Sequence, residues 1–95
     1  MGATYAAETG VGATPDEALA AMLADWVKDS DWPDPYEKGH VQVWDKPVTD
    51  DAIDWMCGWT RQHPPKGVDP DDKWGPWLAF PLARGGWCFH GWVNT

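Results

Sequence analysis

The sequence predicts a small α+β fold in which a mainly antiparallel sheet carries two helices on one face. Two segments combine helix-start signals with apolar residues at helical spacing, and several short segments have the composition or the alternation of strands. Glycines and prolines separate these segments. The predicted order of elements is β-α-β-α-β-β. A chain of 95 residues is long enough for one domain and not for two, so we expect residues 1–95 to form a single compact domain.

The first helix has the clearest start signal in the chain. Residues 3–9 are expected to form a strand, and glycines follow them. Thr14 and Glu17 then make a capping box, with Pro15 at the first helical position. The helix is predicted to run to residue 29, because apolar side chains recur at i, i+3, i+4 and i+7: Leu19, Met22, Leu23 and Trp26.

The middle of the chain predicts a loop, a strand and a second helix. Prolines and a glycine make residues 30–39 a loop, and alternation favours a strand over residues 40–45. Thr49 is a candidate N-cap, and the helix is predicted over roughly residues 50–62. Pro64 and its neighbour end this helix. Its expected inner face contains Ala52, Ile53, Met56 and either Trp59 or Thr60.

Two strands and a glycine turn are predicted at the C-terminal end, over residues 77–82 and 86–94. A turn centred on Arg84-Gly85 would pair Trp77 with Trp92 and Phe80 with Phe89. We favour it over a Gly85-Gly86 turn, which pairs Phe80 with Gly91, because it sets aromatic residues opposite one another. Strand alternation places Trp87 and Phe89 on one face and Cys88, His90 and Trp92 on the other.

Nine tryptophans provide much of the expected core, since each buried aromatic ring removes about 150–250 Å² from water. Trp26 and Trp55 are expected to be core residues, as is either Trp87 or Trp92. Three others, Trp32, Trp74 and Trp77, lie in loops or beside them. Tryptophan often anchors protein interfaces, so we expect at least one of these three to be exposed.

The charge of the chain is strongly negative and unevenly placed. Fifteen acids and seven bases give −8, and residues 25–54 carry nine of the acids against three lysines. Such a field repels nucleic acids and anionic membranes and attracts basic protein surfaces. We therefore expect no direct nucleic-acid binding and no membrane binding. Acidity can equally serve solubility or adaptation to high salt.

The two cysteines leave a second class of function open. No secretory signal precedes them, and we expect reduced thiols in a cytoplasm. Convergence of Cys57, His63, Cys88 and His90 would make a tetrahedral zinc site, although the usual C-x2-C spacing is missing. Cys88 and His90 alone could form a nucleophile and its base. We expect neither, and so predict no metal, no cofactor and no enzymatic activity.

In size and charge the chain resembles the small acidic single-domain proteins of phages and mobile elements, including anti-CRISPR proteins and DNA mimics. This resemblance implies an inhibitor that acts in the host cytoplasm and docks on the basic surface of a nucleic-acid-handling protein. The alternative is a structural or accessory domain that self-associates through tryptophan, and either a monomer or a homodimer is compatible with the sequence. The residues predicted to bind the partner are Asp25, Asp29, Asp31, Trp32, Asp34, Glu37, Asp45, Asp50, Asp51, Asp54 and Trp74.

Overall fold

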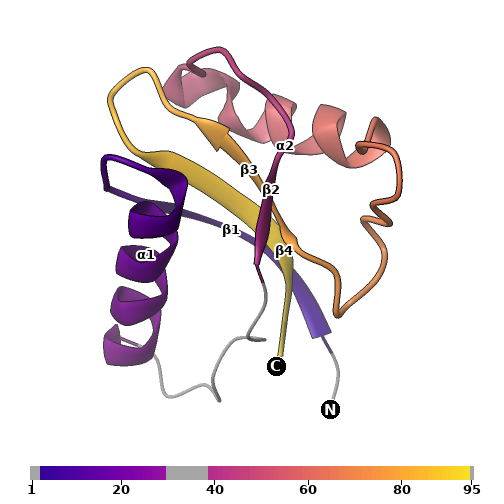
Figure 1. Ribbon diagram of the computed structural model, residues 1–95, viewed down its shortest axis with the longest axis horizontal. Coiled ribbons are helices and arrows are strands. Elements are labelled where there is room, and N and C mark those ends of the chain that lie inside the picture. The colour runs from indigo at the N-terminus through magenta and orange to yellow at the C-terminus, as the bar shows by residue number, and fades with distance from the viewer. Residues whose placement is uncertain (1–2, 30–38, 95) are drawn as a thin grey trace.

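The computed structural model describes residues 3–29 and 39–94. Within them, the chain forms β1 (Ala3–Gly10), α1 (Pro15–Asp29), β2 (His40–Gln42), the short 3-10 helix η1 (Asp50–Ala52), α2 (Ile53–Gln62), β3 (Trp77–Pro81) and β4 (Trp87–Asn94). The α+β class and the predicted order of elements are confirmed (Figure 1). The predicted loop over residues 30–39 lies, except for Gly39, outside the described residues.

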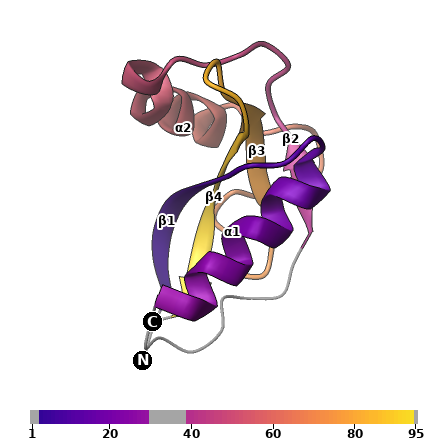
Figure 2. The ribbon, with the colours of Figure 1, turned by 90° about the vertical axis from the view of Figure 1, so that its left-hand side faces the viewer.

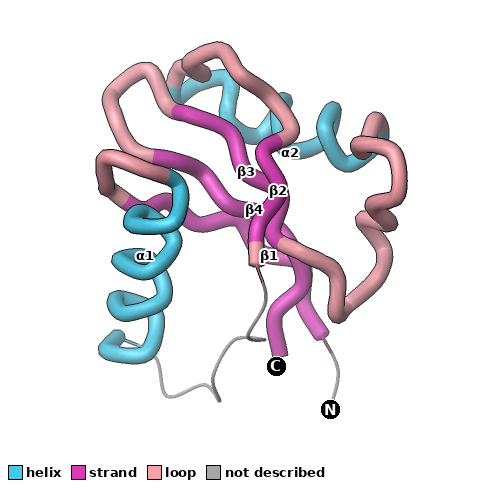
Figure 3. Tube along the Cα trace, viewed as in Figure 1, coloured by secondary structure: helices cyan, strands magenta, loops and turns pink. Residues whose placement is uncertain are grey.

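The four strands form one mixed sheet in the order β1-β4-β3-β2. Strand β4 is antiparallel to both β1 and β3, whereas β2 is parallel to β3. The strands lie together in the middle of the molecule (Figure 3). The second strand is shorter than predicted, since it ends at Gln42, and the Val43 amide adds one more hydrogen bond to the Ala79 carbonyl. The sheet is therefore mainly antiparallel, as expected, with one parallel pair at its edge.

The two helices lie on opposite faces of the sheet, which corrects the prediction that both cover one face (Figure 2). The core beside α1 contains Trp77, Ala79 and Phe89, and the core beside α2 contains Phe80 and Cys88. The first four residues of β3 are all buried, so successive side chains of this strand need cover on both sides. One helix on each face meets that need.

The turn between β3 and β4 shifts their pairing by one residue from the predicted register. Phe80 lies opposite Cys88 and not Phe89. The Gly85 amide donates to the Leu82 carbonyl, and the Leu82 amide donates to the Gly86 carbonyl, both at 3.0 Å. Both glycines have positive φ, 97° and 86°, so the turn uses them in succession and needs one more residue than a two-residue hairpin. Phe80 and Phe89 consequently enter different cores.

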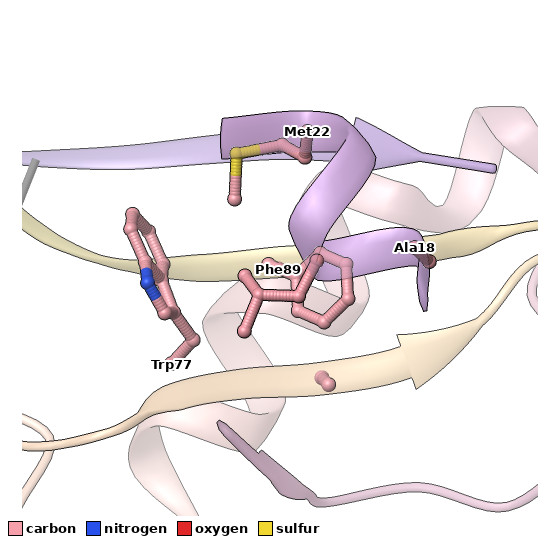
Figure 4. Packing of buried hydrophobic residues seen from close by; sticks show 6 residues of the cluster. Ala18, Met22, Trp77 and Phe89 are labelled. Atoms are coloured by element: carbon pink, nitrogen blue, oxygen red, sulfur yellow. The ribbon is translucent and has the colours of Figure 1, made fainter. Parts of the chain in front are cut away.

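Helix α1 begins as predicted and packs on one of these cores. The Thr14 hydroxyl accepts a hydrogen bond from the Glu17 amide at 3.2 Å, and the Glu17 carboxylate accepts one from Ala13 at 3.0 Å. Figure 4 shows Ala18 and Met22 of this helix over Trp77 and Phe89. The side chain of Trp26, predicted to belong to this core, is not among those described.

Helix α2 starts through η1, and the Thr49 side chain makes no capping hydrogen bond. Met56 and Thr60 are buried against the sheet. Trp55 is 64% exposed, which corrects its prediction as a core residue. At about 100° per residue, position 55 lies on the side of the helix away from positions 56 and 60. Its ring therefore faces outward.

Candidate binding face

A row of aromatic rings lies along one flank of α2, where Trp55 is exposed and Trp44 and Trp59 pack against the core beneath the helix. Trp59 is its centre: its ring stacks on His63 with centroids 4.5 Å apart, and its centroid is 6.4 Å from that of Trp55, with a 21° angle between the ring planes. The Trp44 ring, from the segment after β2, meets Trp59 edge to face at 5.5 Å. Residues 55, 59 and 63 are four apart, so one side of the helix presents all three. We call these four residues the aromatic row.

A shallow groove runs between two rings of this row. Its lining consists of Trp55, Trp59, Gly58, Asp54 and Gln62. Gly58 leaves open space in this part of the surface, because a Cβ atom built on it meets nothing within 4 Å. The groove thus combines two aromatic rings with one carboxylate and one amide.

Acidic side chains surround the beginning of the same helix. Asp50, Asp51 and Asp54 are all exposed, and so is Asp45, which follows Trp44. Asp50 forms an ion pair with Arg84 at 3.2 Å, which offsets part of its charge. Acids in a first helical turn also stabilise the helix dipole, so the three acids have a structural role as well as their negative field.

The structure brings four of the predicted partner-binding residues to one region and separates others from it. Asp54 lines the groove with Trp55 and Trp59, Asp45 follows Trp44, and Asp50 and Asp51 lie in η1 directly before the same helix. Asp25 is exposed on α1, across the sheet, so it belongs to a different surface. Trp74 is 73% exposed in the segment between α2 and β3, as an interface anchor would be. The side chain of Asp29, and all of Asp31, Trp32, Asp34 and Glu37, lie outside the described residues.

The cysteines and histidines do not form the zinc arrangement that the sequence left open. His63 is exposed at the C-terminal end of α2, where its ring stacks on Trp59 and its Nδ1 bonds to the Trp59 carbonyl oxygen at 3.0 Å. His90 is buried on the inner side, where Cys57 and Cys88 belong to the same apolar cluster. Among the residues that the structure describes, no three side chains of metal-ligating type come together.

His90 forms the centre of a buried polar cluster. Its Nδ1 lies 2.5 Å from the Tyr5 hydroxyl and its Nε2 lies 2.9 Å from the Thr60 hydroxyl. Burial, together with the smaller effect of the nearby Arg61 charge, lowers the pKa of His90 to about 4. Burial also raises the pKa of Tyr5 to about 12, against the opposing effect of Arg61. This cluster is enclosed and therefore has the character of a structural network.

Arg61 closes that cluster from outside. Its guanidinium carbon lies 3.9 Å from the centroid of the Tyr5 ring and 5.5 Å from that of the Trp92 ring, and it forms an ion pair with Asp71 at 3.4 Å. The Arg61 guanidinium is thus held by two aromatic rings and a carboxylate.

The sequence prediction is wrong for one member of the aromatic row, Trp55, which was expected in the core and is exposed. Trp59, one of two candidates for the inner face, does pack against the core, as Trp44 does. The available signal was the spacing of Trp55, Trp59 and His63, which sets one aromatic side of the helix apart from Ile53, Met56 and Thr60.

Comparison of the sequence with models of protein families found no match. Searches of curated proteins and of solved structures found no match either. In the described part of the chain, neither helix has the length and apolar character needed to cross a bilayer.

Proposed function

We propose that this protein is a non-enzymatic binding protein that docks on a basic protein surface through the flank of α2 that carries the aromatic row. The observation that carries the proposal is the exposed Trp55 ring in a groove that the exposed Asp54 carboxylate also lines. We define the docking face as Asp45, Asp50, Asp51, Asp54, Trp55, Gly58 and Trp59.

The chemistry of the docking face suits the side chain of an arginine or a lysine. A cation over an indole face gains about 0.5–2 kcal/mol, and more as water is excluded. The groove offers two indole rings and the Asp54 carboxylate, which can accept hydrogen bonds from a guanidinium. Gly58 supports this, because the open space over it lets a planar group approach the helix.

The net charge of −8 suits a partner that normally binds nucleic acid. A row of carboxylates can occupy the place of phosphates on a basic surface, and long-range attraction increases the rate of encounter. The protein would then act as an inhibitor, because its partner cannot hold DNA or RNA at the same site. Among such partners, the docking face favours those whose basic surface presents arginine side chains.

The charge component can be tested with a short arginine-rich peptide and the immobilised protein. We expect the double variant Asp51→Asn/Asp54→Asn to bind the peptide about tenfold more weakly than the parent, with most of the loss in the association rate. The matched control is Asp16→Asn/Asp25→Asn, which removes two exposed acids from α1 on the opposite side of the sheet and should change binding little. Equal losses in both variants would mean that net charge, and not this face, attracts the peptide.

The groove component can be tested at Gly58. Gly58→Ala and Gly58→Gln place successively larger side chains over the groove, and both should stabilise α2 by up to about 1 kcal/mol because glycine is a poor helix former. We expect binding of the same peptide to weaken from alanine to glutamine while stability rises. Gly39→Ala is the matched control, since its Cβ also meets nothing within 4 Å. Unchanged binding in the glutamine variant would exclude the groove.

The inhibitory component needs a competition experiment. A panel of DNA-binding and RNA-binding proteins is loaded with labelled oligonucleotide, and release of the label is followed as the protein is added. We expect release from at least one member, with an affinity that falls steeply as salt rises to physiological levels. A partner bound with an affinity that salt does not change would contradict docking by charge.

Self-association remains the second candidate, and the exposure of Trp55 and Trp74 favours it. Light scattering during size-exclusion chromatography separates the candidates at micromolar concentration. A stable homo-oligomer that Trp55→Ala converts to monomer would assign the aromatic row to self-association. A monomeric parent protein leaves the row available to another protein.

A further inference from the structure

Helix α2 and strand β4 each contain one cysteine, and each cysteine lies shortly before a residue of the contact between Thr60 and His90. The Thr60 hydroxyl of α2 lies 2.9 Å from Nε2 of His90 on β4, which fixes how the helix lies over the strand. Cys57 is one helical turn before Thr60, about 4.5 Å along the axis. Cys88 is two residues before His90 on the same face of β4, about 6.6 Å along the strand. These spacings are compatible with neighbouring thiols, and the two cysteines do meet, since Cys57 packs against the cluster that contains Cys88 and a thiol hydrogen bond joins them.

Both cysteines belong to the core on this side of the sheet. Cys88 is fully buried within the cluster that includes Phe80 and Met56, and Cys57 packs against that cluster while remaining partly exposed. A small reagent can therefore reach Cys57 from the surface, whereas Cys88 has no exposed surface.

The pKa values of Cys57 and Cys88 are shifted in opposite directions, so the two thiols differ in reactivity. A hydrogen bond from the Cys88 thiol lowers the pKa of Cys57. The same hydrogen bond, together with burial, raises the pKa of Cys88. Cys57 is thus the better nucleophile at neutral pH, and Cys88 keeps its proton until the first exchange step is complete.

We propose that Cys57 and Cys88 form a reversible intramolecular disulfide by exchange with a small-molecule disulfide such as oxidised glutathione. The Cys57 thiolate attacks one sulfur of the reagent, forms a mixed disulfide and releases the first thiolate, which takes a proton from water. Cys88 then attacks the Cys57 sulfur, and its proton leaves with the second released thiol. Overall the two cysteines lose two electrons and two protons, and the reagent gains both as two free thiols.

The disulfide would tie α2 to the centre of the sheet. Cys57 and Trp59 of this helix both pack against the cluster that contains Cys88, so oxidation changes how firmly the helix, and with it the aromatic row, is held on the sheet. This inference does not depend on the proposed function.

The experiment uses the full-length reduced protein, incubated at neutral pH with oxidised and reduced glutathione in varied ratio. We expect the intact mass to fall by two hydrogens and both thiols to become unreactive toward iodoacetamide after unfolding. The product should remain monomeric in a non-reducing gel and revert with dithiothreitol. Two variants identify the roles: Cys88→Ala should stop at one glutathione on Cys57, and Cys57→Ser should not react while folded.

Three results would overturn the proposal. The first is a parent protein that stops at the glutathione adduct, because Cys88 would then not reach Cys57. The second is a disulfide that joins two chains. The third is a protein whose thiols both stay reduced at ratios that oxidise dithiothreitol. If Cys88→Ala unfolds, Cys88→Ser with a circular dichroism measurement replaces it, and the mass and gel results on the parent still decide the outcome.

Discussion

Thr60 and His90 meet in the interior with their Oγ1 and Nε2 atoms 2.9 Å apart, and this contact fixes the tautomer of the imidazole. The Thr60 hydroxyl donates to the Met56 carbonyl at 2.8 Å, so its oxygen accepts from His90. Nε2 therefore carries the proton of the neutral ring, and Nδ1 accepts from the Tyr5 hydroxyl. The network is complete only while His90 is neutral, since a proton on Nδ1 removes that acceptor.

The first prediction concerns stability against pH. The pKa of His90 is about 4 in the folded protein and 6.5 in the unfolded chain, so unfolding takes up a proton between these values. The contribution of the neutral ring is complete above about pH 6.5 and is lost as the pH falls to about 4. We expect a loss of about 3 kcal/mol in the free energy of unfolding across this window. Urea unfolding at a series of pH values measures it.

His90→Gln is the matched variant for this prediction. Its amide can donate to Thr60 and accept from Tyr5 but does not titrate. The difference between the parent and the variant isolates His90 from the carboxylates, which titrate in both proteins. Parallel stability curves for the two proteins would show that His90 does not carry the effect.

The second prediction compares two tryptophans in different layers. Trp77→Ala should cost about 3–5 kcal/mol of unfolding free energy, because Trp77 is fully buried in the core beside α1. Trp55→Ala should cost less than about 1 kcal/mol, since most of that ring is already in water. Thermal and urea unfolding give both values. A large loss for Trp55→Ala would mean that the aromatic row stabilises the fold.

The third prediction concerns the contact between β1 and α1. A Cβ atom at Gly10 would lie 2.0 Å from the Ala18 carbonyl oxygen, which belongs to the backbone and cannot rotate away. Gly10→Ala should therefore lower the unfolding free energy by about 3 kcal/mol, by forcing the helix and the strand apart. Gly39→Ala, where the added atom meets nothing within 4 Å, should change it by less than about 0.5 kcal/mol. Equal effects would contradict the close approach.

The fourth prediction follows from the proposed disulfide. Linking Cys57 to Cys88 closes a long loop, so oxidation should raise the unfolding free energy by about 3–4 kcal/mol. Unfolding by urea with and without dithiothreitol measures the difference. Cys57→Ser is the control, because its stability should not respond to the reductant. An oxidised protein less stable than the reduced one would indicate that the bond strains the packing of α2.

The helices and strands could be predicted from the sequence, because the signals for each of them lie within a few neighbouring residues. The capping box at Thr14 and the apolar spacing of Leu19 and Met22 predicted α1, and hydrogen bonds at that cap confirm it. The proline pair after residue 63 correctly ended α2. Strand alternation also assigned Phe89 and Cys88 to opposite faces, as their separate clusters confirm.

Only the tertiary structure decided how these elements are arranged. Strand pairing differed by one residue from the prediction, because two consecutive glycines with positive φ lengthen the turn. A glycine in the sequence does not show which position of the turn it will occupy. The helices went to opposite faces because both sides of β3 must be covered. This placement turned Trp55 outward to the aromatic row and brought Cys57 to Cys88. Residue spacing determines which side chains share a face of a helix or strand, whereas contacts between distant segments depend on how the whole core is packed.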